Sequence, residues 1–103
     1  MPKLYIKEFS KVLNGVGVEP AYNQPPIEIG SASNASDALQ LDTVLVRIWT
    51  DVDCHFVVDC PTDDKDPIAT IKDAPLTAGS EAAFAIWEGG LKIAVIAKDG
   101  RLS

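Results

Sequence analysis

The chain has 103 residues, enough for one domain with a modest core. Its hydrophobic fraction of 47% excludes a disordered chain, and its net charge of −6 argues against nucleic acid as a partner, because phosphate binding requires clustered Lys and Arg. No apolar run approaches the roughly 20 residues of a membrane span, and no secretory signal opens the chain. We therefore expect a protein made in the cytoplasm, with no membrane as partner.

The first predicted strand covers Lys3–Phe9, with Leu4 and Ile6 on one face and Tyr5 on the other. Three lysines and one glutamate give the first eleven residues a charge of +2, which leaves −8 for the remainder. Such a basic segment suits docking onto an acidic neighbour, including another copy of the chain. A solvated strand with scattered lysines is the simpler interpretation.

Residues 10–40 carry little core potential. Asn14-Gly15 predicts a turn, and Ile27 and Ile29 predict one short edge strand among several prolines. We expect an extended arm or long loop here, of the kind that can wrap a neighbouring subunit.

Two segments with period-2 alternation, Thr43–Cys60 and Ala82–Ala97, dominate the rest of the chain. Side chains two residues apart share a face only in an extended backbone, so both segments predict β-structure. Turn signals at Asp51-Val52-Asp53 and Glu88-Gly89-Gly90 interrupt them, which predicts two antiparallel hairpins. Between the hairpins we expect a strand at Ile68–Lys72.

The predicted fold is all-β: a small antiparallel sandwich or barrel of about seven strands. Residues 1–103 form one domain, with an arm and edge strands in 1–40 and the sandwich core in 41–98. No segment predicts more than a single helical turn, which Ser36–Gln40 could make.

The cysteines do not predict a disulfide. If Cys54 and Cys60 end one strand, their Cα atoms lie about 20 Å apart, whereas a disulfide tolerates about 7 Å. Both are expected to be small buried residues on the inward face, in a reducing compartment.

No catalytic residue, metal ligand or cofactor site is predicted. His55 is the only histidine, and its strand neighbours project to the opposite face, so it pairs with neither cysteine. Asp51, Asp53 and the loop aspartates Asp63, Asp64 and Asp66 lack the spacing of a calcium loop, and turn aspartates are usually solvated. We expect a protein that is not an enzyme.

Large outward-facing side chains are the better candidates for function. Apolar groups on both faces of the first hairpin indicate that its second face is also covered, by residues 10–40 or by another subunit. The candidate partner-binding residues are Lys3, Tyr5, Lys7, Leu45, Trp49, Val57 and Trp87. Aromatic faces also stack on sugar rings, so a carbohydrate-binding or receptor-binding module is the alternative, with Trp49 and His55 outward on adjacent strands.

The order of segments in Val44–Ile96 resembles that of small β-sandwich virion proteins of tailed bacteriophages. The resemblance rests on the strand and acidic turn Arg47–His55, the stretch Leu76–Glu81, and the glycine turn into Leu91–Ile96. That group includes capsid decoration (cement) proteins.

The resemblance implies a structural virion protein that stabilises a phage head by bridging neighbouring major capsid protein subunits. A homotrimer, suited to the three-fold positions of a shell, is the expected assembly. The alternative role places the chain in a head fibre or tail-associated receptor-binding module. No functional residue is implied by the resemblance, because such proteins share no catalytic signature.

Overall fold

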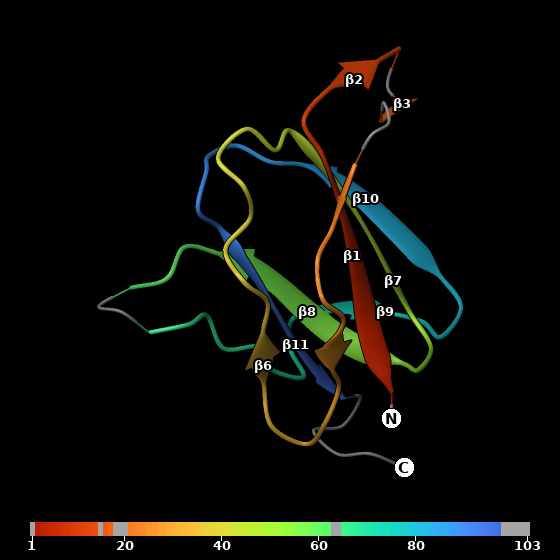
Figure 1. Cartoon of the computed structure of the whole chain (residues 1–103). Helices are drawn as coiled ribbons and strands as arrows, with labels where there is room; N and C mark the ends of the chain where they lie inside the picture. Colours follow the sequence, from red (N-terminus) through yellow and green to blue (C-terminus); the bar gives the residue numbers. More distant parts are fainter. Residues whose placement is uncertain (1, 15, 18–20, 63–64, 98–103) are drawn as a thin grey trace.

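A computed structural model describes residues 2–14, 16–17, 21–62 and 65–97. Within them the fold is all-β, with two antiparallel sheets packed face to face, as the sequence predicted (Figure 1). This described part contains no helix, and so none long and apolar enough to cross a membrane. The helical turn expected at Ser36–Gln40 does not form, and the tail from Lys98 lies outside the described residues.

The first sheet has the order β10-β7-β1-β4, and β5 also pairs with β1. Its strands are β1 (Lys3–Phe9), β4 (Tyr22–Asn23), β5 (Ile27–Glu28), β7 (Leu45–Thr50) and β10 (Glu81–Ala85). The predicted first strand has the bounds of β1, and the predicted edge strand is β5.

The second sheet has the order β6-β11-β8-β9. Its strands are β6 (Asn34–Ala35), β8 (Cys54–Asp59), β9 (Ala74–Leu76) and β11 (Lys92–Ala97). A separate two-stranded hairpin, β2 (Val12–Leu13) and β3 (Val16–Gly17), flanks the predicted Asn14-Gly15 turn and projects beyond the sandwich (Figure 1).

Both predicted hairpins are wrong in their pairing, although their strands are right. β7 pairs with β1 and β10, whereas β8 pairs with β11 and β9, so the acidic turn at 51–53 is a corner between sheets. The glycine turn at 88–90 likewise carries the chain from β10 in the first sheet to β11 in the second. Trp49 and His55 consequently lie in different sheets and are not cross-strand neighbours.

The core forms where the inward faces of the two sheets meet. Val46 and Ile48 from the first sheet and Ile93 and Val95 from the second are fully buried in one cluster. Phe84 of the first sheet stacks on Phe56 of the second, with ring centroids 6.0 Å apart. The alternation predicted from the sequence therefore assigns the inward faces correctly.

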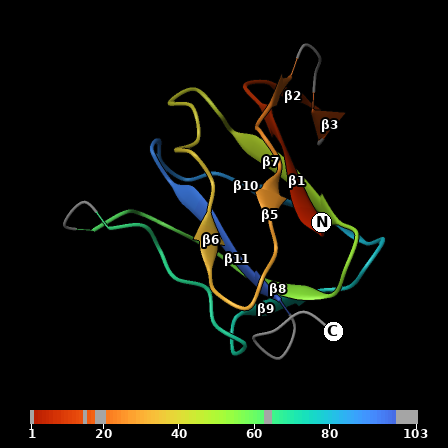
Figure 2. The ribbon, with the colours of Figure 1, turned by 60° about the horizontal axis from the view of Figure 1, so that its bottom comes forward.

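Residues 21–40 are not the extended arm that the sequence suggested. They run along one side of the sandwich (Figure 2), with β4 and β5 paired to β1 and β6 paired to β11, so they link the two sheets. Ile29 and Leu39 are buried in the core. The segment therefore belongs to the domain itself.

A buried carboxylate holds this segment in place. Glu8 is 2% exposed and accepts hydrogen bonds from Gln24 Nε2 at 3.0 Å, Gln40 N at 2.8 Å and Thr43 Oγ1 at 2.7 Å. Buried carboxylates require such donors, because an unpaired charge in the interior is costly. Glu8 thus ties β1 to both ends of the segment.

The prediction of a strand at Ile68–Lys72 is also wrong. These residues form a loop and a turn, in which Asp73 N donates to the Thr70 carbonyl and Thr70 N to the Asp73 carboxylate. The strand of this region is β9, which begins two residues after Lys72 and contains Pro75. Proline is tolerated there because β9 is an edge strand.

Candidate partner-binding surface

Five of the seven candidate partner-binding residues lie together on the outer face of the first sheet. Lys3, Tyr5 and Lys7 alternate with the buried residues of β1, and Leu45 and Trp49 alternate with those of β7. The antiparallel register places Tyr5 opposite Trp49. We call this surface the open face.

An aromatic pair forms the centre of the open face. The rings of Tyr5 and Trp49 stack with centroids 5.6 Å apart and planes 14° from parallel. Trp49 is 36% exposed, although it sits on a central strand of the sheet. Exposed aromatic side chains of this kind are enriched where proteins bind other molecules.

Cationic side chains surround the aromatic pair. Arg47 lies opposite Lys7 in the β1–β7 register and forms an ion pair with Glu81 of β10. The Lys7 ammonium lies 5.6 Å from the ring centroid of Phe9. Lys3 is fixed at the start of β1 because its backbone N–H donates to Asp51 Oδ1 at 2.8 Å. The open face also carries Glu81 and Glu28, which lies opposite Lys3 in the β1–β5 register, so its three cationic side chains leave a small positive excess on a chain whose net charge is −6.

Val57 does not belong to the open face. It lies on β8 in the second sheet, opposite Ala94 of β11, and its side chain is half-buried. Its alternation with the inward residues Phe56 and Val58 directs it to the outer face of the second sheet.

The chain's own residues 66–73 cover that outer face. Asp66 forms an ion pair with Lys92 of β11 at 2.7 Å, and the Asp73 carbonyl lies 2.9 Å from His55 Nδ1 of β8. Ala69 is 2% exposed, and its N–H donates to Ser33 Oγ beside β6. The sequence predicted a cover from residues 10–40 or another subunit, but this face is covered by residues 66–73.

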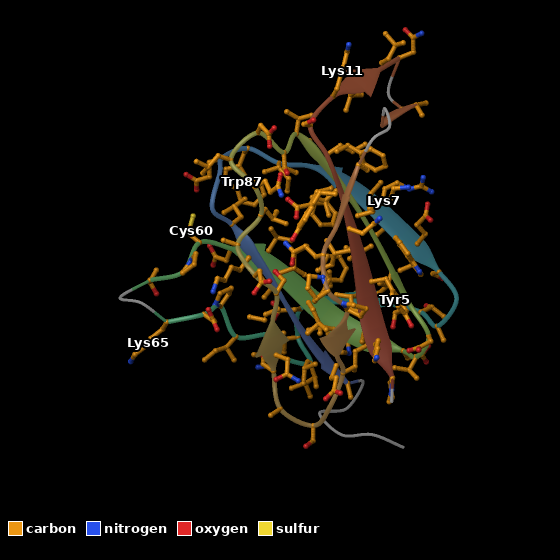
Figure 3. The ribbon with its side chains drawn as sticks, in the orientation of Figure 1. Tyr5, Lys7, Lys11, Cys60, Lys65 and Trp87 are labelled. Atoms are coloured by element: carbon orange, nitrogen blue, oxygen red, sulfur yellow. The ribbon has the colours of Figure 1, made fainter. Side chains whose placement is uncertain are left out.

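Trp87 also lies apart from the open face. It is 65% exposed in the connection between β10 and β11, and Figure 3 shows it on the opposite side of the molecule from Tyr5 and Lys7. Nearby, the Leu41 side chain lies against Gly89, where a Cβ atom would come within 2.7 Å of it.

The two thiols and the histidine form no nucleophilic constellation. Cys54 and Cys60 are not bridged, as predicted, and burial raises the pKa of the Cys54 thiol. Cys60 Sγ donates to Glu88 Oε1 at 2.8 Å, and this hydrogen bond raises its pKa because it favours the thiol over the thiolate. His55 Nδ1 is hydrogen-bonded to the Asp73 carbonyl.

The aspartates of the turns accept hydrogen bonds or form ion pairs with residues distant in the sequence. Asp51 accepts from Lys3 N, Asp53 accepts from Ala78 N, and Asp66 pairs with Lys92. Asp63 and Asp64 lie outside the described residues. Among the residues that are described, no three His, Cys, Asp or Glu side chains come close enough to hold a metal ion.

Two surface hollows, of about 300 and 230 Å³, lie along residues 21–43. The first is lined by Pro25–Glu28 and residues 34–37, and the second by residues that include Glu8 and Tyr22. Neither is lined by Tyr5 or Trp49. The aromatic pair lies on the outer surface of the first sheet, apart from both of these hollows.

The candidate set from the sequence omits Arg47, which lies on the open face, and Glu8, which is buried on the inward face of β1. Arg47 shares the period-2 face of Leu45 and Trp49, and that spacing was sufficient to include it. Glu8 shares the inward face of Leu4 and Ile6, which marks it as a buried charge that needs partners.

Comparison with known proteins gives no match: no protein-family model, no curated protein and no solved structure is significantly similar to this chain.

Proposed function

We propose that the chain is a structural, non-enzymatic virion protein of the capsid decoration type. It binds neighbouring major capsid protein subunits on the outside of a phage head and stabilises the shell. The open face is the surface that makes this contact. The homotrimer expected from the sequence stays a prediction.

One observation carries this proposal: the two sheets have unequal outer faces. Residues 66–73 cover the second sheet, whereas the open face presents the Tyr5–Trp49 stack to solvent. Burying a large aromatic side chain against a partner contributes about 1.5–3 kcal/mol. A stacked pair on a central strand is therefore a favourable anchor for a protein partner.

The charges of the open face favour an acidic partner surface. Lys3, Lys7 and Arg47 surround the aromatic pair, and Glu81 is the acidic side chain that pairs with Arg47. Complementary charge speeds association and fixes register more than it adds affinity. The capsid surface that the chain binds should accordingly carry exposed Asp and Glu.

Empty heads assembled from the major capsid protein of the same phage provide the test. The purified chain should co-sediment with heads at a saturating, fixed ratio and raise the temperature at which they rupture. Trp49→Ala should weaken binding at least about tenfold, because it removes a central aromatic anchor.

Trp87→Ala is the matched control, since it removes an exposed tryptophan on the opposite side of the molecule. It should bind heads like the unsubstituted chain. Failure of the unsubstituted chain to bind heads, or equal losses in the two variants, would refute the proposal.

The Tyr5–Trp49 stack also supports a second function, binding of a carbohydrate or receptor glycan. Parallel aromatic rings offer a flat apolar surface that suits the apolar face of a sugar ring. This function requires the isolated chain to retain specific glycans on an array, with retention lost in Tyr5→Ala and Trp49→Ala. Glycan binding without head binding would favour this function over shell decoration.

A further inference from the structure

β10 is the longest edge strand of the sandwich, and its outer edge has no partner in the described part of the chain. Figure 1 shows β10 at the margin of the first sheet, and in the described part of the chain it pairs with β7 alone. An unpaired strand edge is a template for another strand, so proteins usually shorten such edges or interrupt them with proline or lysine.

The other edges of the sandwich carry such protection. β9 has three residues, of which one is Pro75. β6 has two residues, and β4 and β5 have two each with Pro25 and Pro26 between them. β10 has five residues, Glu81–Ala85, with neither proline nor lysine. It is therefore the edge best suited to accept a strand.

Backbone hydrogen bonds fix which groups of β10 point outward. The Ile6 carbonyl accepts from Gln24 N on the β4 side of β1, so the odd residues of β1 direct their backbone groups toward β7. The alternation then directs Val46 and Ile48 of β7 toward β10. The even residue Ile86 confirms this alternation, because its N–H donates to the carbonyl of the even residue Val44 at 3.0 Å.

Ala82 and Phe84, opposite Ile48 and Val46, therefore use their backbone groups to bind β7. The N–H and C=O groups of Glu81, Ala83 and Ala85 point away from the sheet. Three residues with outward donors and acceptors are enough for a short antiparallel ladder.

We propose that β10 pairs with β10 of a second copy of this chain, antiparallel and about a two-fold axis at Ala83. The proposal does not depend on the proposed function. Such isologous pairing is the simplest route to a closed dimer, and it joins the two first sheets into one continuous sheet.

The side chains of β10 are self-complementary in this register. Ala83 faces its own copy, and Glu81 faces Ala85 of the partner copy rather than another carboxylate. On the inward side Phe84 faces the small Ala82, so a large side chain meets a small one. Glu81 is already neutralised by Arg47.

This two-fold pair is a different assembly from the trimer predicted from the sequence, and the mass of the free chain separates the two. The monomer has a mass of 11.0 kDa. Light scattering of the full chain should show the mass rising toward twice that value between about 10 μM and 1 mM, as expected for a small interface. A monomer throughout this range, or three chains, would overturn the proposal.

Ala83→Pro tests the contact directly, because it removes an outward N–H at the axis and none that binds β7. It should shift the chain to monomer, with the dissociation constant raised at least about tenfold. Ala83→Val, which keeps the N–H, is the matched control and should still dimerise. Dimerisation of a folded Ala83→Pro variant would refute the pairing.

A cross-link covers the case in which Ala83→Pro fails to fold. Hydrogen-bonded antiparallel pairs have Cα atoms about 5.5 Å apart, within the range of a disulfide. In a Cys60→Ser background, Ala83→Cys should oxidise to a covalent dimer. Thr62→Cys, at an exposed site in the loop that follows β8, should not. Equal cross-linking of both variants would contradict the assignment.

Discussion

The two outer faces of the sandwich begin from the same sequence pattern and end differently. β7 and β8 each alternate core residues with outward residues, yet residues 66–73 cover the face of β8, whereas Trp49 of β7 stays 36% exposed in the described part of the chain. Side-chain size follows the difference. Ala35 and Ala94 pair on the covered face, whereas Tyr5 and Trp49 pair on the open face.

Small residues allow a covering segment to approach a sheet closely, and Ala94 is accordingly fully buried. Large aromatic rings project from a sheet and need a partner of their own to be buried. An exposed Trp therefore carries more information about function than an apolar outward position alone.

The largest expected effect comes from loosening the first sheet at Glu8. Glu8→Ala removes the acceptor of three hydrogen bonds, two of them buried, and we expect a loss of about 3–5 kcal/mol in the free energy of unfolding. Urea denaturation measures it. Glu28→Ala, at an exposed position on β5, is the control. A loss no larger than the control's would show that Glu8 does not hold residues 21–43.

The second largest effect is expected from a substitution that displaces the covering segment from the second sheet. Ala69→Asp places a carboxylate at a position that is 2% exposed, so we expect a loss of about 2 kcal/mol in the free energy of unfolding and faster hydrogen exchange across residues 66–73. Ile68→Asp, at the exposed neighbour, should change neither quantity appreciably. Unaltered exchange in the Ala69 variant would mean that the segment is not held on the sheet.

Trp49→Ala on the open face should have a smaller effect on stability. It removes the stack on Tyr5, which is worth about 1 kcal/mol, while the buried side of β7 stays intact. Thermal and urea unfolding measure the change. A loss as large as that of a buried core residue would indicate that the chain itself needs this face closed.

The smallest effect concerns the ion pair across the covered face. Asp66 is more than half exposed, so a double-mutant cycle of Lys92→Ala with Asp66→Ala should give a coupling of about 0.5 kcal/mol or less that falls with added salt. A coupling above about 1 kcal/mol would indicate a stronger contact than an exposed pair makes.

The alternation of residues predicts the strands and their inward faces, but it does not predict which sheet each strand joins. A short acidic turn such as 51–53 fits a hairpin and a corner between sheets equally well, because both require only a tight reversal. The corner is selected by long-range pairing of β7 with β1 and of β8 with β11. Period-2 spacing holds no information on those partners.

The misassigned arm has a similar cause. Residues 21–40 contain few apolar positions, and they are held by backbone hydrogen bonds to β1 and to residues 91–95 and by the buried carboxylate of Glu8, none of which a period-2 pattern marks. The period-2 spacing predicted five residues of the open face and was sufficient to include Arg47 as well, whereas the separation of Val57 and Trp87 from that face required the structure.

Oxidative footprinting of the two tryptophans, in the free chain and in the chain bound to heads, tests the central claim most directly. The account predicts that Trp49 becomes several-fold less reactive on binding, while Trp87 keeps the reactivity it has in the free chain. Protection of Trp87 with Trp49 unchanged would contradict the assignment of the open face as the partner-binding surface.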